Sequence, residues 1–219
     1  MHVKHPHSET PPTDSLRTGD IPDIDLPTIF ASLDGQLIKK SILRTEGAAG
    51  ISQADEHVWH KMVCSFKDSS VDLCNSLAAA ARRMATTFID PESISTLLAN
   101  RGIPLNKNPG LRPIGIGEIL RRAIGKSIMA VVKSDVEKSA GALQLCAGQS
   151  AGVEAAIHAM KQIYEAESCD GILLLDAENA FNRVNRAAAL WNIQYDCPAL
   201  KCTVKTLIVE QRYLQHREK

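Results

Sequence analysis

The sequence lacks the cysteine patterns that organise many small proteins. Six cysteines among 219 residues are too few for a disulfide scaffold, and no Cys-x-x-Cys pair is present to begin a zinc site. The spacing of Cys197 and Cys202 is loose and has no second pair, which disfavours a metal site there. We therefore expect reduced thiols.

Long apolar runs are also missing. The first residues, MHVKHPHSETPPTDS, are polar where a signal peptide would be apolar, and no run approaches the roughly 18 residues of a membrane span. We expect a protein without a membrane association that is intracellular, in the cytoplasm or nucleus, and is not secreted. The sequence does not predict its oligomeric state.

The chain has no net charge, since 25 basic residues balance 25 acidic ones. A uniformly basic nucleic-acid-binding surface is therefore not expected. The distribution is nevertheless uneven, because residues 101–138 hold eight Lys or Arg against three acids, whereas residues 151–182 hold six acids against one Lys. A solvated helix face is the usual explanation of such a basic run, but two of its cations, Lys107 and Arg112, flank a predicted turn.

Composition along the chain indicates four regions. Half of the ten prolines fall within the first 27 residues, which predicts a disordered leader over 1–27. Residues 28–100 are predicted to be a helical N-terminal region. We expect an α/β (α+β) fold in which residues 101–200 add a β-hairpin and a partial sheet packed on helices. Residues 201–219 are strongly polar at their end and are expected to form a tail.

Apolar residues at helical spacing predict the first helices. Ser52 and Asp55 form a weak capping box before the first of them. Asp90 and Pro91 are predicted to be the N-cap and first-turn proline of a later helix, which Gly102 ends. The predicted apolar stripes are Val58, Trp59, Met62, Val63 and Phe66, then Leu73, Leu77, Ala80, Met84 and Phe88, then Ile94, Leu97 and Leu98.

Prolines interrupt the helical pattern next. Pro104, Pro109 and Pro113 forbid a helix, so the turn Asn108-Pro109-Gly110 is predicted to join two extended pieces in a hairpin. Helices are then expected along Ile116, Leu120, Ile124, Ile128 and Val131, from Val153 to Ile163, and from Arg183 to Ile193. Between the last two, Gly171 to Asp176 is predicted to be a buried strand.

Two places could carry chemistry. Lys107 and Arg112 flank the rigid turn, where a fixed backbone can hold two cations at a set separation to bind phosphates. Asp176 ends the predicted strand, and an acid there is either a helix cap or a metal ligand. The residues alone leave both interpretations of Asp176 open.

Three segments of the chain, taken in order, carry a family resemblance. They are NKNPGLRPIGIGEILRRAIGKSI, CAGQSAGVEAA and GILLLDAENAFNRVNR. Their order and spacing are similar to the first half of a retroelement reverse transcriptase domain, and the resemblance covers roughly residues 50–200. It implies the fingers and N-terminal palm of an RNA-directed DNA polymerase. The complete enzyme would use Mg²⁺, an RNA or DNA template-primer and deoxynucleoside triphosphates.

The resemblance also implies roles for individual residues. Asp176 would be the catalytic aspartate that binds Mg²⁺, with the Ala177 carbonyl completing a coordination shell. Lys107 and Arg112 would hold the triphosphate, and Phe181 would exclude a 2′-hydroxyl. The residues expected to contact nucleic acid are Arg121, Arg122, Lys126, Gln149 and Gly152.

The chain departs from this family near its end. It has no Tyr-x-Asp-Asp, and Tyr195-Asp196-Cys197 cannot supply paired carboxylates. One carboxylate cannot hold two metal ions, so we expect a truncated domain that does not polymerise alone. The alternatives are a non-catalytic nucleic-acid-binding remnant and a pseudogene-like product with no stable fold.

Overall fold

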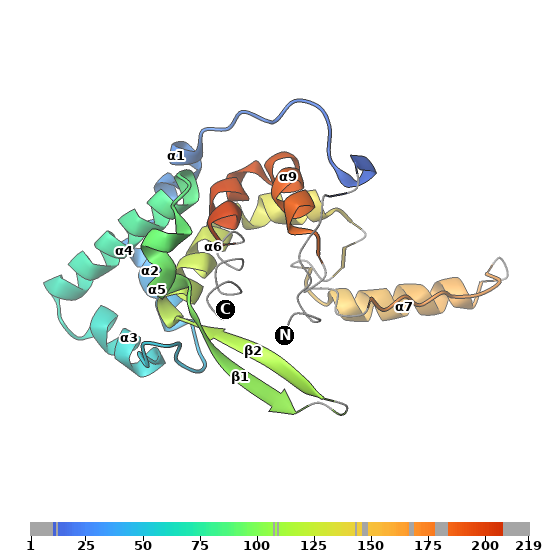
Figure 1. The fold of residues 1–219 in the computed structure, drawn as a ribbon. Coiled ribbons are helices and arrows are strands. Elements are labelled where there is room, and N and C mark those ends of the chain that lie inside the picture. The colour runs from blue at the N-terminus through green and yellow to red at the C-terminus, as the bar shows by residue number, and fades with distance from the viewer. Residues whose placement is uncertain are drawn as a thin grey trace, which may run out of the picture. The chain divides into compact units, whose positions relative to one another are not determined.

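The computed structural model describes residues 11, 13–106, 108, 110–142, 144–145, 149–166, 169–177 and 184–207. These residues divide into two compact units, which are considered separately. Unit 1 takes its described residues from 1–20 and 133–197, and unit 2 from 21–132 and 198–219. Both helices and strands are present and helices predominate, as the sequence predicts (Figure 1).

Besides part of α6, the described residues of unit 2 form six α-helices, the last over residues 201–207, together with a two-stranded antiparallel sheet. Aspartates cap four of its helical segments: Asp25 accepts from Thr28 N, Asp34 from Leu37 N, Asp55 from Val58 N, and Asp90 from Glu92 N. The elements are α1 (Leu26–Ile29), η2 (Phe30–Ser32), α2 (Gly35–Leu43), α3 (Glu56–Cys64), α4 (Asp68–Thr86), η3 (Pro91–Ile94), α5 (Ser95–Leu98), β1 (Asn100–Asn106), β2 (Leu111–Gly117), α6 (Ile119–Ala140) and η4 (Pro198–Leu200).

The buried face of α4 differs from the predicted stripe. Of the five predicted residues only Met84 is buried, and Phe88 lies beyond the helix and is exposed. The helix instead buries small side chains, because α2 packs closely against it and a Cβ at Gly35 would lie 2.3 Å from Asn75 Oδ1. The other buried residues of α4 are Ser70, Cys74, Ala78, Ala81 and Ala85.

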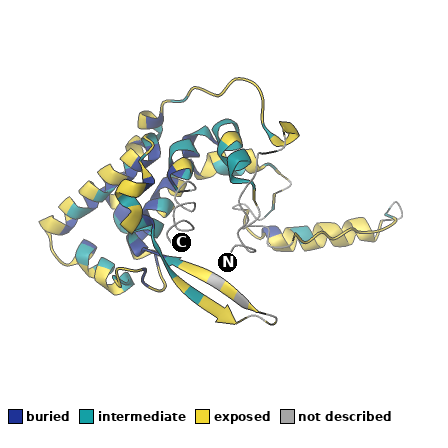
Figure 2. Ribbon diagram, viewed as in Figure 1, coloured by how far each residue is buried: buried dark blue, intermediate teal, exposed yellow. Residues whose placement is uncertain are grey.

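The capping box predicted at Ser52 is wrong, because Asp55 caps α3 and the Ser52 hydroxyl donates to Glu118 instead. In α6, Ile124 and Ile128 are buried as predicted, whereas Ile116 belongs to β2. The buried face of α6 runs from Ile119 to Val132 and faces the core of unit 2, where buried residues gather (Figure 2).

The described part of the predicted polar tail is a packed helix over residues 201–207. Thr203 and Thr206 are buried, and their hydroxyls bond with Met84 O and Ile89 N near the end of α4. Cys202 donates to Thr86 O. These small polar side chains pair with main-chain groups at the end of α4, which explains why a polar sequence packs here.

Unit 1 contains η1 (Thr13–Ser15), α7 (Gly152–Tyr164) and α9 (Arg186–Asp196) within its described part, together with the last residues of α6. Both helices confirm the sequence prediction. The buried strand expected at Gly171–Asp176 is not formed: residues 169–177 are in no strand, and Leu173, Leu174 and Leu175 are 81–86% exposed. Among the described residues no strand pairs with this segment.

None of the helices described by the structure is both long enough and apolar enough to cross a membrane.

Candidate functional site

The predicted hairpin is formed by β1 and β2. The strands pair in register from Asn100 opposite Gly117 to Asn106 opposite Leu111, and Gly110 in the turn adopts a φ of 94°. Pro104 lies opposite Pro113, which a two-stranded ribbon tolerates because both strands are edge strands. The sequence therefore predicts this element correctly, although Pro109 lies outside the described residues.

Arg112 is the described cation nearest the hairpin turn. It pairs with Leu105 in the strand register and is exposed, and the structure gives its side chain no ion pair. Lys107, the second cation predicted to hold a triphosphate, lies outside the described residues. Arg112 is thus available to bind an anion on a backbone that the hairpin register fixes.

The predicted nucleic-acid-binding cations at the start of α6 have partners within unit 2. Arg122 donates to Glu46 O (2.9 Å) and Ala48 O (2.6 Å), and Lys126 donates to Arg44 O (2.7 Å). Arg121 donates to Leu98 O and to Asn100 Oδ1. These three side chains therefore attach α6 to the loop after α2 and to the start of β1, and their predicted contact with nucleic acid stays a prediction.

Glu118, immediately before α6, joins the same loop. Its buried carboxylate accepts from Ser52 N (2.8 Å) and from Ser52 Oγ (2.6 Å). Burial by itself would raise the pKa of Glu118, but these hydrogen bonds, one from the Ile51 backbone and the nearby Arg121 charge lower the pKa below its ordinary value. The carboxylate is therefore ionised and holds the loop in place.

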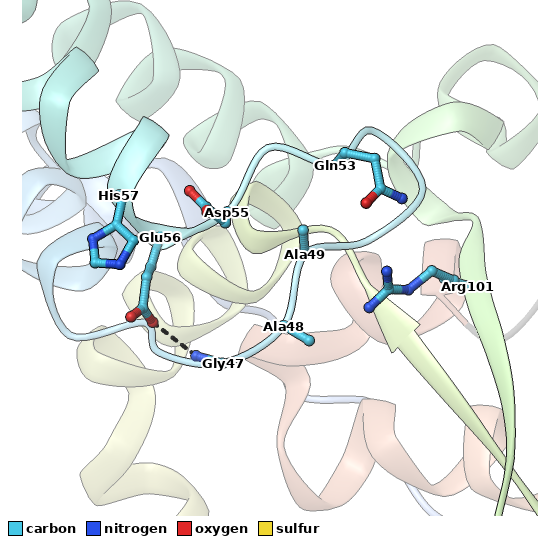
Figure 3. A pocket seen from close by; sticks show the side chains of 8 residues that line it. All are labelled: Gly47, Ala48, Ala49, Gln53, Asp55, Glu56, His57 and Arg101. Carbon is cyan, nitrogen blue, oxygen red and sulfur yellow. Dashed lines mark hydrogen bonds between the residues drawn. The ribbon is translucent and has the colours of Figure 1, made fainter.

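A pocket of about 410 Å³ opens beside this loop, at the first turn of α3 (Figure 3). Two of its carboxylates already have partners, since Asp55 caps α3 and Glu56 Oε2 accepts from Gly47 N (2.9 Å). Arg101 projects toward it from β1, and its buried Nε has no hydrogen-bond partner. The lining residues are Gly47, Ala48, Ala49, Gln53, Asp55, Glu56, His57 and Arg101.

The predicted metal ligands lie in unit 1. Asp176 and Ala177 are both exposed and follow the leucine run that is in no strand, while Phe181 lies outside the described residues. A carboxylate oxygen suits Mg²⁺. A two-metal centre needs further carboxylates, however, and in the part of the chain that the structure describes no three ligating side chains gather. The described residues thus do not fit such a centre by themselves.

Gln149 and Gly152 are predicted to contact nucleic acid on a looser match to the family. Gly152 is the first residue of α7, and Gln149 lies three residues before it. Gly152 is buried, and a Cβ there would lie 1.8 Å from Leu145 O, so the position requires glycine for a close backbone approach. Gln149 is exposed, and its carbonyl accepts from Gly152 N (3.4 Å). The structure thus gives Gly152 a role in the local turn, and its contact with nucleic acid stays a prediction.

Sequence reasoning missed Glu118 and Ser52 as partners. Sixty-six residues separate them, and neither lies in a spacing that predicts a contact. It also missed the contacts of Arg17 with α9, because a proline-rich leader is predicted to be free. The sequence shows that these residues are polar but does not indicate their partners.

Comparison with protein-family models, with curated proteins and with solved structures finds no match to this chain.

Proposed function

We propose that the chain supplies the fingers and the first palm carboxylate of a retroelement reverse transcriptase. The order and spacing of the segments around Lys107, Gln149 and Asp176 carry this proposal. The hairpin is a supporting observation, because it forms at the expected residues and leaves Arg112 exposed beside its turn. The hairpin cations would bind the triphosphate of a nucleotide.

In the complete enzyme, a primer 3′ oxygen would attack the α-phosphorus of a deoxynucleoside triphosphate, and pyrophosphate would leave. Bound Mg²⁺ ions would supply the activation of that oxygen and the neutralisation of the leaving group. Asp176 is the one residue of this chain proposed as a carboxylate ligand, and the described residues do not fit a two-metal centre. We therefore propose that the 219 residues bind nucleotide without polymerising.

The first experiment measures equilibrium binding of a fluorescent deoxynucleoside triphosphate to the whole chain. Arg112→Ala should weaken binding about tenfold or more, because a charge-assisted contact to phosphate is lost. Lys133→Ala is the matched control, since Lys133 is an exposed cation on α6 with Glu137 as its partner. Equal losses in the two variants would contradict a specific role of the hairpin.

The second experiment tests polymerisation with primer-template, Mg²⁺ and all four deoxynucleotides. No extension is expected from this chain. Incorporation that disappears in Asp176→Ala would show that the chain assembles a complete metal centre, and it would overturn the inactivity that we propose.

A further inference from the structure

The described end of the leader makes specific contacts with α9 inside unit 1. Trp191 Nε1 donates to Arg17 O (2.8 Å), and Asn192 Nδ2 donates to Ser15 O (2.9 Å). Arg17 N donates to Asn192 Oδ1 (2.9 Å), and the Arg17 guanidinium lies 3.2 Å from Asp196 Oδ1. Three side chains of one helix thus contact Ser15 and Arg17.

Most of these contacts recognise main chain. The carboxamide of Asn192 presents a donor and an acceptor as a fixed pair, and it uses them on the carbonyl before Leu16 and the N–H after it. A neighbouring β-strand can use the same pair of groups around a residue. Because main-chain groups are common to all residues, this part of the contact accepts many sequences.

One contact selects a side chain. Asp196 lies one helical turn after Asn192, so its carboxylate meets the side chain of the residue whose N–H Asn192 binds. A positively charged residue is favoured at that position and an acidic residue is disfavoured. Trp191 and Tyr195, each next to one of these two residues in the sequence, form an aromatic pair with ring centroids 6.0 Å apart.

The attachment is of a kind that can exchange. No residue of η1 is buried, and the Arg17 and Asp196 side chains remain 64% and 40% exposed. Leu16, between the two contacted residues, is half-buried. Exposed polar contacts are individually weak, so the pair of Arg17 with Asp196 can break without disturbing a buried core.

We propose that Trp191, Asn192 and Asp196 form a peptide-binding surface that the chain's own residues 15–17 occupy. The ligand that it fits is a non-helical peptide with Arg or Lys two residues after the carbonyl that Asn192 binds. A segment of this pattern in another protein competes with the leader. This surface is independent of the proposed polymerase relationship.

The test uses the full chain and a fluorescein-labelled peptide of residues 11–20, PPTDSLRTGD, with binding followed by fluorescence anisotropy. The wild-type chain should bind it weakly, because the leader occupies the surface. Arg17→Glu places an acid opposite Asp196 and displaces the leader, so the peptide should bind at least about tenfold more tightly, in proportion to the freed fraction.

Asn192→Ala, made in the Arg17→Glu chain, should remove the gain in affinity. Asp196→Lys is made in the chain that keeps Arg17, where the two like charges displace the leader. This variant should bind a peptide with Glu at the position of Arg17 and reject the original peptide, a switch that requires a folded α9. Glu165→Lys on α7 is the matched control and should change binding by less than about twofold, as expected for an exposed charge away from the contact.

Each outcome decides the proposal. Tighter binding in Arg17→Glu together with the charge switch in Asp196→Lys supports a surface that reads a basic peptide. No gain in Arg17→Glu, affinity that survives Asn192→Ala, or an unchanged preference in Asp196→Lys would overturn it.

Discussion

The two units differ in where their apolar side chains lie. Among the described residues, every buried apolar side chain but that of Cys197 belongs to unit 2. Unit 1 instead exposes one face of α7 and the leucine run that follows it. The exposed residues are Val153, Ile157, Met160, Ile163, Tyr164, Ile172, Leu173, Leu174 and Leu175.

This difference has a physical consequence for stability. Burial of apolar surface is the main favourable contribution to folding, so unit 2 has the means to fold cooperatively. Exposed contiguous apolar surface usually marks an interaction site or a tendency to aggregate. The reading of the sequence as a product with no stable fold is therefore disfavoured for unit 2, while unit 1 depends on polar contacts such as those of α9.

Truncation of an isoleucine to alanine in each unit gives the largest expected difference in the free energy of unfolding. Ile42 in α2 is 0% exposed and Ile157 in α7 is 62% exposed. Ile42→Ala should lower the free energy of unfolding by about 2–5 kcal/mol, because it leaves a cavity in the core. Ile157→Ala should change it by less than about 0.5 kcal/mol. Urea denaturation followed by far-UV circular dichroism measures both, and equal losses would show that the face of α7 is covered in solution.

Local signals in the sequence predicted the hairpin and the start of η3 in unit 2. Prolines and the Asn-Pro-Gly turn determine the hairpin because they act within a few residues. Asp90 and Pro91 likewise mark the start of η3. Such features depend on backbone conformation alone, so they can be read without knowledge of what packs nearby.

Contacts between distant residues could not be predicted in this way. The buried face of α4 passes through Cys74 and Ala78, because close packing with α2 selects small side chains over the larger Leu73 and Leu77. Arg122 and Lys126 of α6 bind carbonyls more than 70 residues away in sequence, and a sequence does not distinguish a carbonyl partner from a phosphate. The strand expected at Gly171–Asp176 needs a partner strand that the pattern cannot supply.

A buried carboxylate in unit 2 and an exposed one in unit 1 give the next comparison. Glu118→Gln should cost about 1–3 kcal/mol at neutral pH, because Ser52 loses a charged acceptor. Glu165→Gln on α7 should cost less than about 0.5 kcal/mol, since its pair with Lys161 is exposed. Chemical denaturation at a series of pH values measures the difference.

The pH dependence gives a second readout for Glu118. Its folded-state pKa is lowered, so the stabilisation that it provides is present above about pH 4.3, the ordinary glutamate value, and is lost as the pH falls through the folded-state pKa. The stability of wild type should therefore approach that of Glu118→Gln in acid. A stability difference that stays constant down to low pH would show that the ionised carboxylate is not the stabilising form.

The smallest effect compares two cations on the same helix, because α6 contributes residues to both units. Arg122→Met removes two hydrogen bonds to carbonyls of unit 2 and should cost about 1 kcal/mol. Lys133→Met removes only an exposed i,i+4 pair and should cost less than about 0.5 kcal/mol. Thermal and chemical denaturation measure both variants.

The same two variants also decide between structural and nucleic-acid roles for Arg122. If the hydrogen bonds of Arg122 serve to hold the loop after α2, its loss should lower stability, and nucleic-acid binding should fall only as far as stability does. Salt-dependent binding to a primer-template, measured in parallel, reports phosphate contacts. If Arg122→Met kept its stability and lost that binding while Lys133→Met kept both, the carbonyl contacts would be dispensable and Arg122 would be a phosphate ligand, as the resemblance implies.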